Sequence, residues 1–564
     1  MFNTYFVEKI SALKENINQN ITEDPLERIR KKMKNKNLSF KLQTVKAETV
    51  KKLMKKMANK KSKGKDGIPQ DCLLQGHEVI AAPLTSVINC SIATGIFPEQ
   101  WKEAIVIPIL KKGDTKETKN YRPVSCLPAA SKVVEKVICE QLTRFVEVHG
   151  LLPTNQHGFR AKRSTMTALS SMQKDWVRSA EEGLMTGVLV WDLSAAFDTL
   201  DIDLLLKKLA IYGADETTLD WFRSFLTNRT QRVRIGGTLS SPLGLETGVP
   251  QGGILSPIVF TLYTADMELW IKHSTLVNFA DDTTTYTTSK EARHIKDSLE
   301  EDAKQVLKFM ASNGLIANET KTEFLLLNEK QKDTQQLKSL MVGEVSVQRT
   351  SETRLLGVVI DEAQDWSDQL NKLISSLNQR LFFIRRIARQ IPRNKLINVV
   401  HSIWMSKLRY GLQLCLKVRL IEEDAKISAH KSLQTTQNRM LRALNGTRIK
   451  DKVSTKSMLE KYDLMSVNQL AATIKLTEVW KIKNQEQYPL KLEPYNPHAN
   501  RIQQLLRNKT NRVFNDSCRL KNSESSFHID AARVWNAAPE SVQNALTLSI
   551  AKSKIKIFCK TLPV

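Results

Sequence analysis

Two adjacent carboxylates, Asp281 and Asp282, lie between two short runs of apolar, β-branched and aromatic residues. The flanking runs, residues 276–278 and 283–288, predict two strands, so the acidic pair is expected at or beside a hairpin turn. Adjacent carboxylates repel each other, and divalent cations placed between them and a phosphate relieve that repulsion. An Asp-Asp pair taken alone is more often an ordinary polar turn.

A third carboxylate favours the chemical interpretation. Asp192 directly follows the apolar run 186–191, which predicts a buried strand with this acid at its end. Between the two acidic sites lies the glycine-rich segment Gly248–Pro257, which is expected to form a loop that opens a helix. An acid on a strand, a glycine-rich loop before a helix, and an acid pair on a hairpin follow one another in the palm of template-directed polymerases.

The motifs resemble those of reverse transcriptases from non-LTR (LINE-type) retrotransposons, especially jockey-like elements. The resemblance is carried by DLSAAFD, GVPQGGILSP and FADD, by NYRPVSCLP and QHGFRAKRST before them, and by LIANETKT and RLLGVVI after them. It covers residues 65–365 with motifs and continues more loosely to the end of the chain.

The resemblance implies an α+β fold of the right-hand polymerase type, with fingers, a palm built on an antiparallel sheet, and a helical thumb. Fingers are expected at 66–180, the palm with its catalytic motifs and primer grip at 181–365, and the thumb at 366–480. A basic helical segment at 1–65 and a basic extension at 481–564 flank them. Lysines clustered in the first segment suit either phosphate contact or a solvated helical face.

The same resemblance implies two-metal nucleotidyl transfer from a dNTP to a primer 3′-hydroxyl. Asp192, Asp281 and Asp282, with the carbonyl of Leu193, would hold two Mg²⁺ ions, for which Mn²⁺ could substitute. Lys321 would lie near the leaving pyrophosphate as a general acid, although a surface lysine fits the sequence equally well.

Other residues are expected around the incoming nucleotide: Lys111, Lys112, Arg122, Phe197, Gln251 and Gly252. The cations flank a predicted hairpin and could neutralise the triphosphate, or they could form surface ion pairs. The family places an aromatic residue at 197 beneath the sugar, where it excludes a 2′-hydroxyl; plain core packing is the alternative. Asp198 is expected to be structural because it falls past the site.

Template and primer contacts are implied for two further motifs. Arg160 and Arg163 belong to the GFR and RST elements, which the family places against the template strand. Thr165 could equally be a helix cap. Leu356 and Gly357 lie in the apolar run 354–361, which is expected to be a strand resembling the primer grip, although core packing also explains the apolar residues.

Periodicity predicts the remaining elements. Helices are expected at 71–97, 131–148, from 166 onward, at 217–226 and at 291–312, and strands at 101–110, 229–237 and 323–327. Residues 366–446 are expected to be helical and basic, with Arg380, Arg385, Arg386, Arg389 and Arg393 in and just after one helix. Such a surface suits the backbone of a nucleic-acid duplex.

The composition supports a polyanionic partner. The 564 residues include 85 Lys and Arg against 59 Asp and Glu, a net charge of +26. Such an excess does not help folding, and it suits a polyanionic partner. The resemblance implies that this partner is template RNA and primer DNA. No run of about 18 apolar residues predicts a membrane span, and the seven cysteines show no CxxC spacing. An intracellular protein of nucleus and cytoplasm is therefore expected.

Two alternatives remain open from the sequence. One is a nucleic-acid-binding remnant of such an element without polymerase activity, and the other is a maturase-like reverse transcriptase. The finger motifs begin near residue 65, which suggests that any endonuclease is a separate protein. The oligomeric state is left open.

Overall fold

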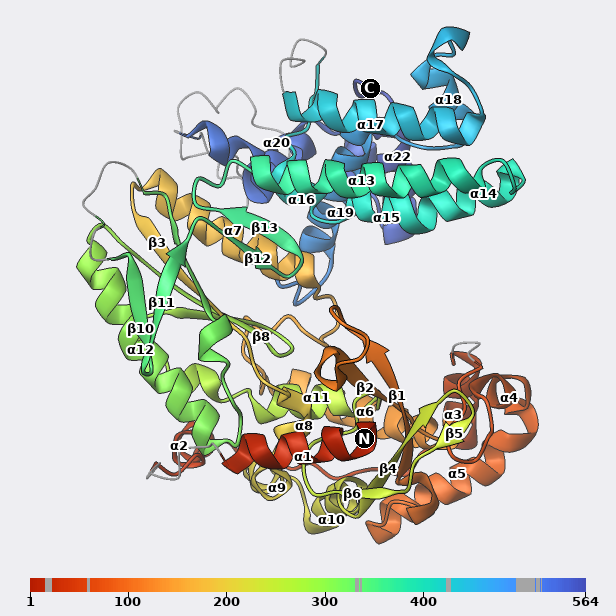
Figure 1. The fold of residues 1–564 in the computed structure, drawn as a ribbon, viewed down its shortest axis with the longest axis vertical. Coiled ribbons are helices and arrows are strands. Elements are labelled where there is room, and N and C mark those ends of the chain that lie inside the picture. Colours follow the sequence, from red (N-terminus) through yellow and green to blue (C-terminus); the bar gives the residue numbers. More distant parts are fainter. Residues whose placement is uncertain are drawn as a thin grey trace.

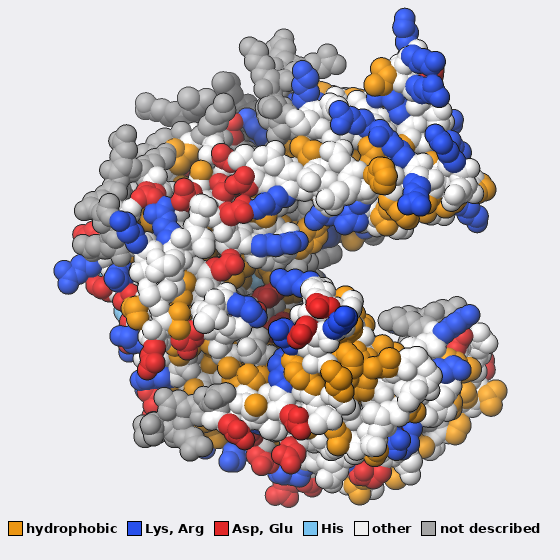
Figure 2. Space-filling view, in the orientation of Figure 1, with side chains coloured by type: hydrophobic (Ala, Val, Ile, Leu, Met, Phe, Trp, Pro, Cys, Tyr) orange, Lys and Arg blue, Asp and Glu red, His pale blue; other side chains and the backbone are white. Residues whose placement is uncertain are grey.

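The computed structural model describes residues 1–15, 23–57, 61–329, 334, 337–421, 428–492, 513, 518 and 520–564. A six-stranded central sheet joins a lower lobe, which contains the N-terminus, to a helical upper lobe that contains the C-terminus (Figure 1). The two lobes enclose an open cleft, and Lys and Arg side chains gather along its rims (Figure 2). Helices and sheets mix in this way in α+β proteins.

The central sheet has the strand order β10-β11-β9-β3-β8-β7. Its strands are β3 (Met185–Trp191), β7 (Thr275–Phe279), β8 (Asp282–Ser289), β9 (Glu323–Leu327), β10 (Ser339–Val342) and β11 (Val345–Thr350). Strand β3 lies in the middle and pairs antiparallel with both β8 and β9. Its buried, apolar character, predicted from the sequence, is confirmed.

Helices cover both faces of the central sheet. Helix α12 (Ala292–Ser312) packs on one face, where a Cβ on Gly187 would collide with Ile295 and Leu299. Helix α7 (Thr165–Glu181) packs on the other face, where Trp176 and Tyr286 meet edge to face at 5.9 Å. Because β3 alternates its side chains between the two faces, both halves of the core meet at this strand.

A second sheet, in the lower lobe, has the order β2-β1-β4-β5, with β6 paired to β4. The strands are β1 (Glu103–Leu110), β2 (Tyr121–Cys126), β4 (Arg229–Ile235), β5 (Thr238–Leu239) and β6 (Leu243–Leu245). Strand β1 pairs antiparallel with β2 and parallel with β4. The sheet therefore pairs β1, which precedes residue 180, with β4, which follows it. The boundary expected between fingers and palm at residues 180 and 181 thus does not separate the two sheets.

Helices surround this lower sheet. They are α1 (Phe2–Glu15), α2 (Glu27–Met33), α3 (Ala47–Lys55), α4 (Gln70–Gln75), α5 (His77–Thr94), α6 (Ala129–Val148), α8 (Ala196–Thr199), α9 (Ile202–Ile211), α10 (Glu216–Leu226) and α11 (Ser256–Tyr263). The helix predicted at 71–97 is divided at Gly76 into α4 and α5. It ends as expected at Gly95, which adopts φ +68° and caps α5.

The upper lobe is helical. Its described elements are α13 (Ser367–Ile387), α14 (Arg393–Val399), a π-helical segment at Val400–Met405, α15 (Ser406–Arg409), α16 (Leu412–Cys415), α17 (Ser428–Asn445), α18 (Thr455–Lys461), α19 (Val467–Asn484), α20 (Phe527–Ala537), α21 (Glu540–Gln543) and α22 (Leu548–Cys559). No helix among the described residues is long and apolar enough to cross a membrane.

The described part of the C-terminal segment belongs to this lobe's core. Lys475 of α19 and Asp530 of α20 form a fully buried ion pair at 2.7 Å. The Lys475 ammonium also donates to the carbonyl of Leu416, and the Asp530 carboxylate accepts from the backbone N–H of Val418. Residues 520–564 are therefore packed into the lobe, whereas the sequence suggested a basic extension.

The prediction of one strand at 354–361 is wrong. The segment is a hairpin of β12 (Glu352–Leu355) and β13 (Val358–Asp361), with Leu355 opposite Val358. Leu356 and Gly357 turn the chain with φ +47° and φ +81°. An apolar run continues through this turn, which is why the periodicity did not reveal it.

Candidate active site

Three carboxylates lie at one end of the central sheet. In the β3–β8 pairing Trp191 is opposite Thr283, so the next residues along the two strands are Asp192 and Asp282. In the neighbouring β7–β8 hairpin, Ala280 and Asp281 form the connection. The predicted hairpin at the acidic pair is confirmed, and the antiparallel register is what brings Asp192 beside it.

A loop from the lower lobe holds the acidic hairpin in place. The backbone N–H of His157 donates to the carbonyl of Asn278 at 2.7 Å. The side-chain oxygen of Gln156, itself 1% exposed, accepts from the N–H groups of Gly158 and Ala280 at 2.8 and 3.3 Å. Ala280 has φ +61°, an uncommon conformation for a residue with a Cβ. These contacts stabilise that conformation and fix where the next two carboxylates point.

Asp192 is fixed by a different segment. Its carbonyl accepts a hydrogen bond from the backbone N–H of Asn318 at 2.8 Å, and Leu193 forms a bridge with Ala317. The Lys321 ammonium then lies 3.3 Å from the Asp192 carboxylate. The structure thus brings Lys321 to the acidic group, to which the sequence had assigned it only through the resemblance.

The acidic group is electrostatically strained. Burial raises the pKa of Asp282 to about 6, and the charges of Asp281 and Asp192 add to that effect. Burial also raises the pKa of Asp281, with Asp192 adding to the rise and Arg122 opposing it. Both side chains still open to the cleft. A bound cation would remove this repulsion.

Carboxylate oxygens are the ligands that Mg²⁺ prefers in proteins. In the described part of the chain no three His, Cys, Asp or Glu side chains already form a closed ligand set. Asp192 instead pairs with Lys321. The three carboxylates therefore fit divalent cations by their chemistry and by their mutual repulsion, and the Asp192 side chain would turn from Lys321 to complete the set.

Two cations lie close to the carboxylates: Arg122, whose charge lowers the pKa of Asp281, and Lys321, which pairs with Asp192. Lys111 follows β1, and Arg122 lies in β2, so both belong to one hairpin. Burial and the charges of Lys9, Arg122 and Lys321 lower the pKa of the Lys111 ammonium. Lys112 is exposed beside Lys111. Sequence reasoning found the hairpin cations but missed Lys9, because nothing in the sequence connects α1 to residues a hundred positions later.

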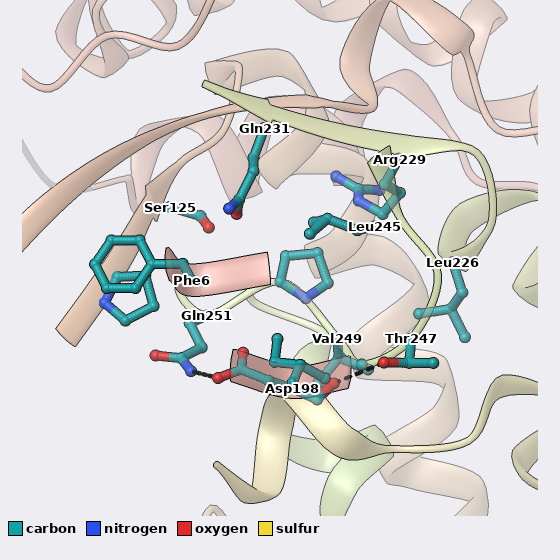
Figure 3. A pocket seen from close by; sticks show the side chains of 14 residues that line it. Phe6, Ser125, Asp198, Leu226, Arg229, Gln231, Leu245, Thr247, Val249 and Gln251 are labelled. Carbon is teal, nitrogen blue, oxygen red and sulfur yellow. Dashed lines mark hydrogen bonds between the residues drawn. The ribbon is translucent and has the colours of Figure 1, made fainter. Parts of the chain in front are cut away.

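The glycine-rich loop is anchored on both sides (Figure 3). The side-chain amide of Gln251 donates to the Asp198 carboxylate at 2.6 Å. The backbone carbonyl of Gln251 accepts from the backbone N–H of Ser125 at 2.8 Å. Burial raises the pKa of Asp198 to about 6. Gly252 has φ +125°, and a Cβ there would lie 2.6 Å from the Ser125 carbonyl oxygen. The absence of a side chain at Gly252 therefore lets the loop backbone pack closely against β2.

A buried acid on α6 holds the start of α11. The Glu135 carboxylate accepts from the N–H groups of Ile254 and Leu255 at 2.6 and 3.2 Å, and from the Ser131 hydroxyl at 3.1 Å. Burial raises the pKa of this fully buried carboxyl. Sequence reasoning missed Glu135, whose partners lie about 120 residues later in the chain.

Phe197 packs beside this loop. Its ring stacks on Phe260 of α11 with centroids 4.6 Å apart and meets the edge of Phe159 at 6.4 Å. The Phe197 side chain is half-buried. The backbone carbonyl of Phe197 accepts from the backbone N–H of Val249. Packing and access to the cleft therefore coexist at this position.

The arginines expected at the template differ in their surroundings. The Arg160 guanidinium donates to both oxygens of Glu147, at 2.8 and 2.7 Å, and to the carbonyl of Pro153. Its side chain is only 9% exposed, so its donors serve the loop. Arg163 donates to the carbonyl of Thr154. Helix α7 is capped by Ser164, not by Thr165.

The tip of the β12–β13 hairpin faces the acidic group. Leu356 and Gly357 line a hollow of about 310 Å³ together with Thr165, Phe279 and Asp282. The hydroxyl of Tyr410 donates to the carbonyl of Leu356 and so ties the tip to the upper lobe. The two residues that the resemblance placed at the primer grip are therefore adjacent to one of the three carboxylates.

Comparison with known proteins agrees with this geometry. Residues 109–360 match the family described as reverse transcriptase (RNA-dependent DNA polymerase). Three relatives from Drosophila melanogaster are similar over longer stretches. They are the probable RNA-directed DNA polymerase from transposon X-element, 26% identical over 69% of this chain, that from transposon BS, 25% over 72%, and the RNA-directed DNA polymerase from mobile element jockey, 26% over 67%.

The matched stretch contains every strand of the central sheet and all three carboxylates. The chain spans less than half the length of these relatives, since the similarity covers 43%, 45% and 42% of them.

Proposed function

The chain carries a reverse transcriptase domain of the LINE type, and on that premise we propose that it synthesises DNA on an RNA template. The observation that carries the proposal is the placement of Asp192, Asp281 and Asp282 at one end of adjacent strands, with Arg122 near enough for its charge to lower the pKa of Asp281. Reverse transcriptases generally use divalent metal ions, and this is where such ions would be held.

In this proposal the three carboxylates and the carbonyl of Leu193 hold two Mg²⁺ ions. Bound there, the ions would lower the pKa of the primer 3′-hydroxyl and neutralise charge on the triphosphate. The protein's own part is to keep three acids together against their repulsion. It does so through the Gln156 contacts to the hairpin and the Asn318 contact to Asp192.

The incoming nucleotide would lie between the acids and the β1–β2 hairpin. Lys111 and Arg122 would bind the triphosphate, with Lys112 beside them. Gln251, kept in place by Asp198 and Ser125, would contact the sugar or base through Gly252 and its own side chain. Such positioning groups lower the barrier chiefly by fixing the reacting atoms in line.

Two side chains would contribute selectivity and proton transfer. Phe197, stacked on Phe260, would lie beneath the sugar and exclude a 2′-hydroxyl. Lys321 would move from the Asp192 carboxylate toward the leaving pyrophosphate and donate a proton to it.

The nucleic acid would occupy the cleft. The hairpin tip of Leu356 and Gly357 would seat the primer end, because it borders the same hollow as Asp282. Of the two arginines near the template path, we assign the contact to Arg163, since Glu147 already engages Arg160. The exposed arginines of α13 and just beyond it, Arg385, Arg386 and Arg389, would contact the duplex backbone.

This assignment makes the lower lobe the fingers, the central sheet the palm and the upper lobe the thumb of a right-hand polymerase. Template RNA, primer DNA and dNTPs are then the partners. We further propose that the protein acts in the nucleus and the cytoplasm, and that a separate endonuclease supplies any nick in the target.

The test is primer extension on an RNA template with dNTPs and Mg²⁺. The wild type is compared with Asp281→Asn and with a control, Asp297→Asn, whose carboxylate lies exposed on α12. Extension by the wild type and the control, with loss in Asp281→Asn, supports the proposal. No extension by any of them, together with salt-sensitive binding of an RNA–DNA duplex, would instead identify a binding remnant without polymerase activity.

A further inference from the structure

Helix α1 is fixed firmly to the lower sheet. The Asn3 amide donates to the carbonyls of Ser241 and Gln231 at 2.9 and 3.3 Å, and its oxygen accepts from the Gln231 amide at 3.0 Å. Phe2 meets the Tyr121 ring edge on at 5.0 Å, and Phe6 is 6% exposed. These contacts give α1 a defined position on the sheet, where the sequence predicted a basic helical segment without a position.

The helix backs the glycine-rich loop. Phe6 and Ile10 line a small cavity together with Asp198 and Gln251 (Figure 3). Its volume of about 40 Å³ has room for a few water molecules but not for a nucleotide. The cavity is therefore an interface between α1 and the loop, and it places one face of α1 directly behind Gln251.

Lys9 projects from the same turn of α1, one residue before Ile10 and three after Phe6, and it is exposed. Its charge acts on both ends of the nucleotide region: it opposes the rise in the pKa of Asp198 and helps to lower the pKa of Lys111. The packing of α1 agrees with this: Phe2 contacts Tyr121, the residue before Arg122, and Phe6 and Ile10 border Asp198.

Lys9 is therefore a neighbour of the hairpin cations Lys111 and Arg122, because α1 packs along β2 and the glycine-rich loop. The charges of Lys9 and Arg122 repel that of Lys111 and help to lower its pKa. A ligand with several negative charges relieves the repulsion. A nucleoside triphosphate, which the neighbouring carboxylates would accept through divalent ions, has that character.

We propose that Lys9 of α1 binds the triphosphate of the incoming nucleotide. The inference rests on the proposed function and extends it, because it makes the first helix part of the nucleotide site. In this arrangement the triphosphate is held from two sides, by the β1–β2 hairpin and by α1. Contacts to Asn3 and Phe6 set the position of the lysine.

The experiment measures equilibrium binding of a complementary dNTP, and of the matching dNMP, to the full chain on a primer–template. The primer ends in a dideoxynucleotide, so that no chemistry follows. The proteins are the wild type, Lys9→Ala, Lys9→Arg and a control, Lys552→Ala, whose lysine is exposed on α22. We expect Lys9→Ala to weaken dNTP binding about tenfold or more, since a charge-assisted hydrogen bond is lost. Binding of the dNMP should be unchanged, and Lys9→Arg should bind within about threefold of wild type.

Equal dNTP binding by Lys9→Ala and wild type would overturn the inference. Equal weakening of dNTP and dNMP would also overturn it, because the loss would then be structural. Tighter binding by Lys9→Ala would show that α1 obstructs the site, and this too overturns it. Primer extension on an unblocked primer separates the two proposals: a wild type that extends while Lys9→Ala binds normally contradicts this inference alone. A wild type that shows Lys9-dependent dNTP binding without extension contradicts the polymerase function alone.

Discussion

Gly158 lies directly against Ala280, so that a Cβ on the glycine would collide with the backbone nitrogen of that alanine. Ala280 is the residue before the acid pair and holds an uncommon positive φ. The position of the lower-lobe loop therefore determines where Asp281 and Asp282 lie. It gives the glycine of the GFR motif a role at the acidic hairpin.

We predict that Gly158→Ala reduces primer extension at least tenfold, because even a small displacement of the hairpin misplaces two carboxylates. The cost in folding free energy should be about 1–3 kcal/mol, as for other crowded sites. Extension rates and urea unfolding check both values. Gly237→Ala is the control, since a Cβ at Gly237 meets nothing within 4 Å. If Gly158→Ala extends primers as the control does, the hairpin does not depend on this contact.

A second prediction concerns pH. The pKa of Asp282 is raised to about 6, above its usual value, so ionisation of this side chain disfavours the folded state. Between about pH 4 and pH 6 the folded protein binds more protons here than the unfolded chain, and this group's contribution to stability falls as pH rises. In metal-free buffer, Asp282→Asn should therefore raise Tm at about pH 7.5 and lose this advantage near pH 4.

Thermal unfolding of wild type and Asp282→Asn across this pH range tests the sign. Adding Mg²⁺ at neutral pH should raise the Tm of the wild type more than that of the variant, since the ion binds the folded site. A variant that is less stable than wild type at neutral pH without metal would show that the carboxylates do not repel one another there.

The third prediction concerns Glu135. Glu135→Ala leaves the buried N–H groups of Ile254 and Leu255 without their acceptor, at a cost of about 1–3 kcal/mol each. Since these residues begin α11 next to Gln251, we also expect a rise of about tenfold in KM for dNTPs, with a smaller change in kcat. Steady-state kinetics and urea unfolding measure the two effects. Glu140→Ala on the exposed face of α6 is the control, and equal behaviour of both variants would contradict this role.

The fourth prediction concerns the buried pair in the upper lobe. Breaking it with Lys475→Met should cost about 3 kcal/mol, because the buried Asp530 carboxylate loses the ammonium and keeps only its contacts to Arg533 and to the N–H of Val418. Replacing both residues, Lys475→Met with Asp530→Leu, should recover part of that loss. Urea unfolding gives the three free energies. If the single variant is as stable as wild type, α20 is not anchored through this pair.

Parts of the fold followed from local sequence pattern. The buried strand before Asp192, the hairpin at Asp281 and the end of a helix at Gly95 each depend on a few consecutive residues. The hairpin at Leu356 and Gly357 did not follow, because apolar character continues through its turn and only the backbone angles reveal it.

The candidate site shows the same division. The carboxylates and hairpin cations were identified through contiguous motifs. Gln156, Glu135 and Lys9 act through partners far away in the sequence, and one sequence without the fold contains no trace of such pairings. The partner of Arg160 was missed for a different reason: Glu147 is only 13 residues away, but an irregular loop, which periodicity does not describe, brings the two together.

The middle strand of the central sheet is also the first of its six strands in the chain. Strand β3 ends at Trp191, whereas its two neighbours begin at Asp282 and Glu323. During synthesis from the N-terminus, this apolar strand must wait for more than half of the chain to appear before both its edges are paired. Long-range pairing of this kind slows folding and leaves an aggregation-prone segment exposed meanwhile. Protection by chaperones would therefore matter most while residues 192–327 leave the ribosome, until β9 can pair with β3.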